Sequence, residues 1–342
     1  MAVRTNFFRL LAVSQSVWLG LRESLMGIGK SENNKVMKMV IEDMIAQVST
    51  GKNLWDTMSK HPYVFEVTQV ELIKAAQTMG NMPEVLKEVA NEMENYQKIQ
   101  AKIKWSLMYP ATLMVFTVLA VVILLIKVVP TIVSLFPSPE QLPSITKTTI
   151  AISDFVKQRW FVIFAVLFGS VATYNVLYAL FLPFKIFIDG LFLKIPVIKD
   201  AVKTFYMYRF SKLLGDFLHA GVNPIHALDQ MSKILQNFFY HAKVVDIKND
   251  LTAWFTFADA IEWSDLFDPI LVQIIVVGEA TGNLGEILQT MSIFYKDQLM
   301  EKITTLMWFI EPILMAFIAI IIGSIVASIF LPLADLVNVI GW

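Results

Sequence analysis

The side chains that most often carry out catalysis or bind metal ions are scarce in this sequence of 342 residues. The chain has no cysteine, which excludes disulfides, thiolate zinc sites and cysteine nucleophiles. No two of its histidines are four residues apart, the spacing that places two metal ligands on one face of a helix. The four are His61, His219, His226 and His241. We therefore predict no catalytic residue, no metal site and no cofactor.

One short motif resembles the end of a phosphate-binding loop, namely Gly29-Lys30-Ser31. Such a loop also needs a glycine five residues before Gly29, where this chain has Ser24, and an apolar strand before that glycine. No Gly-x-Ser-x-Gly elbow and no constellation of paired carboxylates occurs either. The sequence therefore gives no support to a nucleotide site or to acid–base catalysis.

A different kind of chemistry is indicated by Glu311, the single charge in the apolar segment 303–334. A bare carboxylate inside a bilayer costs several kcal/mol, so we expect it to lie near the interface, to be protonated or to be paired. Pro312 follows it and can kink the helix. Two interpretations remain open. Glu311 is an interfacial residue that reaches water, or it makes a polar contact with a neighbouring helix or with the membrane segment of a substrate.

The composition points to a membrane protein. Hydrophobic residues make up 56% of the chain and charged residues only 17%, whereas soluble domains have about a quarter charged residues. The formal net charge of −1 gives nucleic acid no electrostatic reason to bind. A bilayer core needs about 20 apolar residues in a helix. Three segments meet this length, 105–126, 160–184 and 303–334, and we predict a transmembrane helix in each.

Lysine and arginine predict the orientation of these helices. Positive charges are concentrated before residue 105 and between residues 185 and 302, and the cytoplasmic side of a membrane carries such an excess. We therefore expect 1–104 and 185–302 to be cytoplasmic modules. The loop 127–159 and the tail 335–342 are then periplasmic. The prolines at 137, 139 and 143 suit a short, extended external loop.

The chain contains an internal repeat. Residues 73–86 read IKAAQTMGNMPEVL and residues 275–288 read IVVGEATGNLGEIL. The same spacing of 202 residues relates further pairs along the chain, without a gap. The matched pairs are Gly80 and Gly282, Asn81 and Asn283, Glu84 and Glu286, Leu86 and Leu288, Pro110 and Pro312, Pro130 and Pro332, Phe65 and Phe267, and Phe8 and Phe210. We predict an all-α membrane protein with two repeated cytoplasmic helical bundles and three transmembrane helices.

Local patterns give the limits of several helices in the two modules. Apolar residues from Val36 to Val48 recur every three or four positions, and Gly51 is placed to end that helix. His61-Pro62 marks a break, and Asn223-Pro224 predicts a helix start with asparagine as the cap. The Gly-Asn pairs at 80–81 and 282–283 indicate tight helix–helix turns. These turns are purely structural or are also contact surfaces for a partner, and the sequence leaves both interpretations open.

Paired motifs now carry a family resemblance. They are Gly278-Glu279-Ala280-Thr281-Gly282-Asn283-Leu284, Glu311-Pro312 and Leu331-Pro332-Leu333 in the second copy, and Tyr109-Pro110, Val129-Pro130 and Leu142-Pro143-x-x-Thr146 in and after the first. Over nearly its whole length the chain resembles the type II secretion F family, the inner-membrane platform proteins of type II secretion systems and type IV pilus machines. It departs from the family pattern at Gln77, where glutamate is usual, and at Met79, where a small residue is common. Its length is similar to that of the short platform proteins of type IVb pilus systems.

This resemblance implies a scaffold in the bacterial inner membrane, with its N-terminus in the cytoplasm and its C-terminus in the periplasm. Its implied partners are a hexameric cytoplasmic assembly ATPase, the transmembrane helices of pilins or pseudopilins, other inner-membrane subunits of the machine and further copies of the chain. The candidate partner contacts are Gln77, Gly80, Asn81, Glu84, Gly278, Glu279, Gly282, Asn283 and Glu286. The corresponding membrane motif is Tyr109, Pro110, Pro130, Glu311, Pro312 and Pro332.

Two other classes of protein compete with this interpretation. A transporter or channel usually has more helices, inverted repeats and several polar residues within the membrane. Here both repeats insert in the same direction, and one intramembrane charge is present. A membrane-bound enzyme would need a catalytic constellation that the sequence does not contain.

Overall fold

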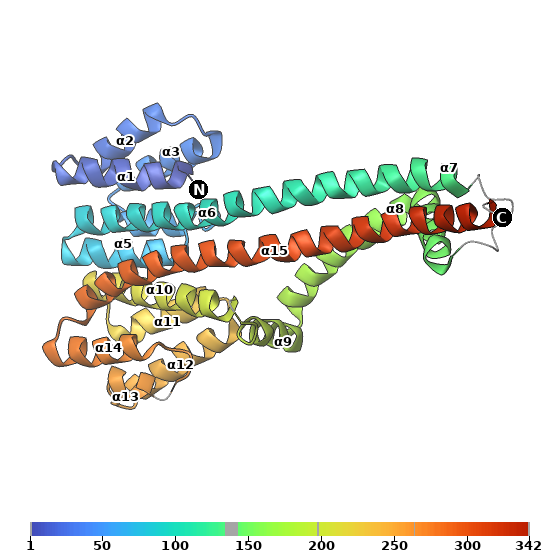
Figure 1. Cartoon of the computed structure of the whole chain (residues 1–342). Helices are drawn as coiled ribbons and strands as arrows, with labels where there is room; N and C mark the ends of the chain where they lie inside the picture. The colour runs from blue at the N-terminus through green and yellow to red at the C-terminus, as the bar shows by residue number, and fades with distance from the viewer. Residues whose placement is uncertain (1, 134–142, 197, 263, 341–342) are drawn as a thin grey trace. The chain divides into compact units, whose positions relative to one another are not determined.

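A computed structural model describes residues 2–133, 143–196, 198–262 and 264–340 (Figure 1). Every regular element in these ranges is helical, which confirms the predicted all-α class. The chain forms two compact units. The first comprises 1–102 and 186–303, and the second comprises 103–185 and 304–342. The predicted extended loop around Phe136–Pro139 and Leu142 lies outside the described residues.

The first unit contains two groups of helices, which we call the first and second modules. The first module contains α1 (Ala2–Ser16), α2 (Leu21–Ser31), α3 (Lys35–Ser49), α4 (Leu54–Ser59), α5 (Val67–Met79) and the start of α6 (Met82–Ile123). The second contains α10 (Ile198–His219), α11 (Pro224–Ile234), α12 (Phe238–Thr252), α13 (Phe257–Glu262), α14 (Pro269–Thr281) and the start of α15 (Leu284–Ile340). Each module ends with a 13-residue helix, a tight turn and a long helix (Figure 1). These two helices are α5 and α6 in the first module, and α14 and α15 in the second.

Each module has an aromatic pair in its core. Phe8 and Phe65 stack edge to face at 5.9 Å between ring centroids, and Phe210 and Phe267 do so at 4.8 Å. The sequence repeat aligns the first contact pair with the second, because it matches Phe8 with Phe210 and Phe65 with Phe267. All four rings are buried, and each such contact adds to the free energy gained from removing the rings from water. The apolar positions that repeat in sequence therefore occupy equivalent core positions.

Several predicted helix limits are confirmed. Helix α3 ends at Ser49, and Gly51 follows in the left-handed conformation with φ of 86°. Helix α11 begins at Pro224, and the side chain of Asn223 accepts a hydrogen bond from the backbone N–H of Ile225. His61 and Pro62 lie between α4 and α5.

Helices α10 and α15 approach closely because two glycines face each other. A Cβ on Gly215 would lie 2.9 Å from the backbone nitrogen of Gln289 and 3.2 Å from the carbonyl oxygen of Gly285. A Cβ on Gly285 would lie 3.1 Å from the backbone nitrogen of His219. Because the contacted atoms belong to the backbone, they cannot move aside as a side chain could.

The second unit contains the apolar parts of two long helices that begin in the first. These helices are long and apolar enough to cross a membrane, over Met82–Thr131 and Leu284–Leu331. Most of their large apolar side chains are exposed, as expected for surfaces that face lipid. The first is continued by a π-helical turn, η1 (Leu124–Val128), and by α7 (Val129–Val133).

The predicted membrane segment 160–184 is divided between two helices, α8 (Ser144–Leu180) and α9 (Leu182–Phe192). The helix axis bends by 105° between Phe168–Leu180 of α8 and Leu182–Phe192, which is α9. These two parts make a third candidate span only if they are counted together as one span. Phe181 is extended between them, and Pro183 explains the break, because it lacks the N–H group needed to continue α8. Helix α8 also has a non-helical residue, Arg159, one position before the predicted start of the segment.

Two hydroxyl groups on α8 satisfy backbone carbonyls that prolines leave without a helical donor. In the π-helical turn, Val129 donates to Leu124, so the next bond in that register would run from Pro130 to Leu125. Proline has no N–H, and Ser153 Oγ instead donates to the Leu125 oxygen at 2.5 Å. In α15 the residue four positions after Ser328 is Pro332, and Thr146 Oγ1 donates to the Ser328 oxygen at 2.8 Å.

We expect Gly215→Ala to lower the free energy of unfolding by about 1–3 kcal/mol, because the added methyl group collides with the backbone of α15. The matched control is Gly27→Ala in α2, where a Cβ meets nothing within 4 Å. Alanine favours the helix, so this change should raise stability by about 0.5–1 kcal/mol. Thermal unfolding of the detergent-solubilised protein, followed by tryptophan fluorescence, measures both. Equal midpoints would contradict the close packing.

We also expect Thr146→Val to destabilise the second unit by about 1–2 kcal/mol, because the isosteric side chain leaves the Ser328 carbonyl unsatisfied. Thr148→Val is the control. Thr148 is exposed, and its hydroxyl bonds only to Ser144 on its own helix. The thermal midpoint should fall for the first variant and stay within error for the second.

Candidate functional site

The two Gly-Asn turns have the same geometry. Gly80 ends α5 with φ of 81°, and Gly282 ends α14 with φ of 69°. The next residues, Asn81 and Asn283, donate their backbone N–H groups back to Ala76 and Gly278, at 3.2 and 3.0 Å. Each turn is therefore a Schellman-type helix end, which places glycine in the left-handed conformation. The prediction of tight helix–helix turns is confirmed.

Glu279 and Gln77 perform the same structural task in their modules. The two carboxylate oxygens of Glu279 accept hydrogen bonds from the backbone N–H groups of Phe257 and Ala258, at 2.9 and 3.1 Å. These are the first residues of α13, so Glu279 caps a helix that precedes its own. Gln77 Oε1 accepts from the N–H of Leu54, the first residue of α4, at 3.1 Å.

The replacement of glutamate by glutamine at position 77 therefore keeps part of the cap. Glutamine has one acceptor oxygen where glutamate has two. The amide nitrogen of Gln77 is used as well, because it donates to Asn53 Oδ1 at 3.1 Å. Both side chains are half-buried.

The remaining motif residues of the modules differ in exposure. Gly278 is buried, and a Cβ there would lie 3.0 Å from Leu284 Cδ1, which explains a small residue at this position. Gly282, Asn283 and Glu286 are exposed, and Asn283 Nδ2 donates to Glu286 Oε2 at 2.6 Å. Glu84 is also exposed, and it lines a groove of about 430 Å³ together with Arg9 and Lys87.

The residues of the membrane motif lie in the second unit. Tyr109 and Pro110 lie within α6, and Pro312 and Pro332 lie within α15. Pro130 is the second residue of α7. Glu311 is exposed on α15 beside the exposed ring of Trp308. It makes no side-chain hydrogen bond or ion pair among the described residues.

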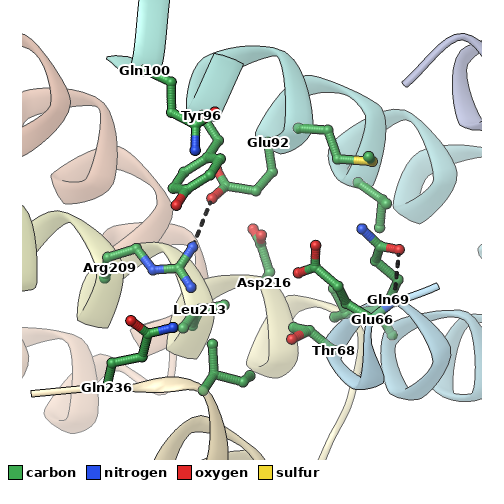
Figure 2. Close-up of a pocket in the computed structure, with 14 residues that line it drawn as sticks. Glu66, Thr68, Gln69, Glu92, Tyr96, Gln100, Arg209, Leu213, Asp216 and Gln236 are labelled. Carbon is green, nitrogen blue, oxygen red and sulfur yellow. Dashed lines mark hydrogen bonds and ion pairs between the residues drawn. The ribbon is translucent and has the colours of Figure 1, made fainter. Parts of the chain in front are cut away.

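A partly buried polar cluster, which sequence reasoning did not find, joins the two modules. We call it the seam cluster. It consists of Glu88 and Glu92 on α6, Tyr208, Arg209, Lys212, Asp216 and His219 on α10, and Gln289 on α15. Tyr208 donates its hydroxyl to Glu92 Oε2 at 2.7 Å, and Arg209 lies 3.6 Å from Glu92 Oε1. Figure 2 shows the guanidinium of Arg209 pointing toward the Glu92 carboxylate, with the ring of Tyr96 close to both.

Gln289 connects two carboxylates at the other end of the cluster. Its amide nitrogen donates to Glu88 Oε1 at 3.0 Å and to Asp216 Oδ1 at 3.3 Å, and so bridges the modules. Lys212 pairs with Asp216 at 2.7 Å, and the imidazole of His219 lies 3.6 Å from Glu88. Three members of the cluster, Glu92, Arg209 and Asp216, line a cavity of about 360 Å³ that opens to solvent (Figure 2).

Burial governs the electrostatics of the seam cluster. It raises the pKa of Glu92, and burial together with the charge of Asp216 raises the pKa of Glu88. Burial alone would lower the pKa of Lys212, but the charges of Asp216 and Glu92 hold it above its ordinary value. Lys212 therefore stays charged, whereas the two glutamates ionise less readily than exposed ones. The arrangement suits reversible contact between two bodies more than catalysis.

Comparison with known proteins identifies the family. The family model for protein F of the type II secretion system matches residues 7–130 and 210–332. The type IV pilus assembly protein PilC of Pseudomonas aeruginosa is 26% identical over 336 residues, covering 98% of this chain and 90% of that protein. The type II secretion system protein F of the same organism is 26% identical over 335 residues, covering 97% and 82%.

A third relative agrees with these two. The type IV pilus assembly protein TapC of Aeromonas hydrophila is 25% identical over 334 residues, covering 97% of this chain and 81% of that protein. Relatives named for pili and relatives named for secretion thus match almost the whole chain at similar identity. The two matched ranges of the family model together span most of the sequence. This chain belongs to the type II secretion system protein F family.

Proposed function

We propose that this chain is the inner-membrane platform of a type IV pilus or type II secretion machine. The observation that carries the proposal is the family match over 7–130 and 210–332, together with relatives named for both kinds of machine. The apolar helices over Met82–Thr131 and Leu284–Leu331 support a membrane location. The chain acts with other machine subunits and as a homo-oligomer, and it carries out no catalysis of its own.

In this function the platform couples a cytoplasmic hexameric ATPase to the extraction and polymerisation of pilins held in the membrane. Helices α6 and α15 support the coupling, because each begins in a module and continues into an apolar span. A force applied to a module would therefore act on a helix that continues into the membrane.

The proposed topology has three spans, with the bent pair α8 and α9 as the second. It has two repeated modules on the cytoplasmic side, and the C-terminus is periplasmic. The charge distribution of the sequence supports this orientation. The same number of residues separates α5 from α14, the glycine that ends α5 from the glycine that ends α14, and Gln77 from Glu279, which cap α4 and α13. This common spacing supports the repeat.

Glu311 is proposed to contact the transmembrane helix of a pilin or pseudopilin. The carboxylate is exposed about a quarter of the way into the apolar segment 303–334, and an exposed charge inside such a segment is costly without a partner. A donor on a neighbouring transmembrane helix would remove that cost.

We expect Glu311→Ala to abolish or strongly reduce fibre assembly while the protein still inserts at normal levels. The control is Asp297→Ala, also on α15, because Asp297 is 71% exposed and precedes the apolar segment. In a strain lacking the native copy, sheared pili or secreted substrate measure assembly, and membrane fractions measure insertion. Wild-type assembly by the Glu311 variant would exclude the residue from the mechanism. Substrate-specific flux through proteoliposomes of the purified protein would favour a transporter instead.

We expect Glu279→Ala to reduce assembly as well, because the loss of the α13 cap costs about 1–2 kcal/mol locally. Glu279→Gln should restore much of the activity, since Gln77 performs this task in the first module. The same assembly assay measures both variants. If glutamine were as defective as alanine, the negative charge would be needed for a partner and the cap would not explain the residue.

A further inference from the structure

We call the contact surface between the two modules the seam. The two modules contribute different kinds of polar group to it. The first module contributes the acceptors Glu71, Glu88 and Glu92. The second contributes the donors, and two of them are histidines. The donors are Tyr208, Arg209, His219, His226 and Gln289. The contact between the modules therefore sets acidic side chains of the first module against hydrogen-bond donors of the second.

The seam cluster has more carboxylates than permanent cations. Its acids are Glu88, Glu92 and Asp216, and its permanent cations are Arg209 and Lys212. One further proton on Glu88 would balance these charges. Glu88 Oε2 is buried and has no hydrogen-bond partner, whereas a protonated carboxyl could act there as a donor.

We propose that the seam between the two modules is a proton-dependent latch, which binds one proton when it is closed and releases it when it opens. Among the described residues, the charged or titratable side chains around Glu88 are Glu92 from its own helix and Arg209, Lys212, Asp216 and His219 from α10. From α15 the side chain that contacts Glu88 is that of Gln289, which is neutral. Burial of the Glu88 carboxyl, together with the charge of Asp216, drives the uptake of the proton. The latch depends only on the seam and not on the proposed platform function.

The direction of the pH dependence follows from burial. The pKa of Glu88 is raised in the closed state, so the carboxyl binds a proton more readily there than when the seam is open. The closed state is therefore favoured as the pH falls through the raised pKa, and it loses this advantage as the pH rises. One linked proton changes the ratio of closed to open forms by at most about tenfold per pH unit.

The absence of cysteine allows a direct test on the full-length protein. Val89 lies on α6, is 3% exposed and lines the seam cavity, so Val89→Cys places one thiol under the latch. Its rate of modification by a maleimide, divided by that of a free thiol peptide at the same pH, gives the open fraction. Val40→Cys is the control, because Val40 is 1% exposed in the core of the first module and does not line the seam cavity.

We expect the protection of the thiol at position 89 to rise as the pH is lowered from 8 through the raised pKa of Glu88, and that at position 40 to lack this rise. Adding Glu88→Gln should increase the protection at pH 8 and flatten the pH dependence. Glu94→Gln should leave the dependence unchanged, because Glu94 is on the same helix but pairs with Arg9 and Lys98 outside the seam.

Asp216→Asn provides a second variant should Glu88→Gln fail to fold. It should also reduce the slope, because the charge of Asp216 helps to raise the pKa of Glu88. Protection at position 89 that is independent of pH would overturn the latch. A full slope in the Glu88→Gln or Asp216→Asn protein would do so as well, and so would an equal rise at position 40.

Discussion

The need to satisfy backbone hydrogen bonds wherever a helix is interrupted underlies most of this structure. A helix end or a proline leaves N–H or C=O groups without helical partners, and in a buried or apolar setting each such group costs about 1–3 kcal/mol. Gly80 and Gly282 meet this need by folding the chain back on itself, and Glu279 and Gln77 meet it for α13 and α4. Ser153 and Thr146 meet it for the carbonyls associated with Pro130 and Pro332. These residues thus share one physical purpose although their chemistry differs.

Much of this arrangement could be predicted from the sequence, because turns and caps are local. A glycine followed by asparagine predicts a left-handed helix end, and Asn-Pro predicts a helix start, whatever the rest of the chain does. The break at Phe181 is also local, since Pro183 is visible in the sequence, but a continuous run without charge obscured it. The role of Glu279 was not predictable, because its partners Phe257 and Ala258 lie more than twenty residues earlier on another helix.

The seam cluster escaped prediction for a further reason. Glu92 and Tyr208 are 116 residues apart, and Glu88 and Gln289 are 201 apart, so no local pattern connects them. The repeat does not reveal the cluster either, because the positions equivalent to Glu88 and Glu92 in the second copy are Thr290 and Phe294. An internal repeat preserves what each module needs to fold, whereas the contact between modules requires the copies to differ. The differences between copies, more than their shared residues, therefore mark the interface.

Two of the helices that carry seam residues continue into the apolar segments. Helix α6 carries Glu88 and Glu92 and then the first apolar segment, while α15 carries Gln289 and then the last. A buried ionic cluster contributes little to net stability, because the cost of removing charges from water offsets most of the attraction. Apolar residues of similar volume would hold the modules together at least as well. A cluster with excess acid gives instead a contact whose strength changes with its proton content, at the point where both long helices begin. A permanent joint would not need this property, whereas a joint that opens and closes during each working cycle would.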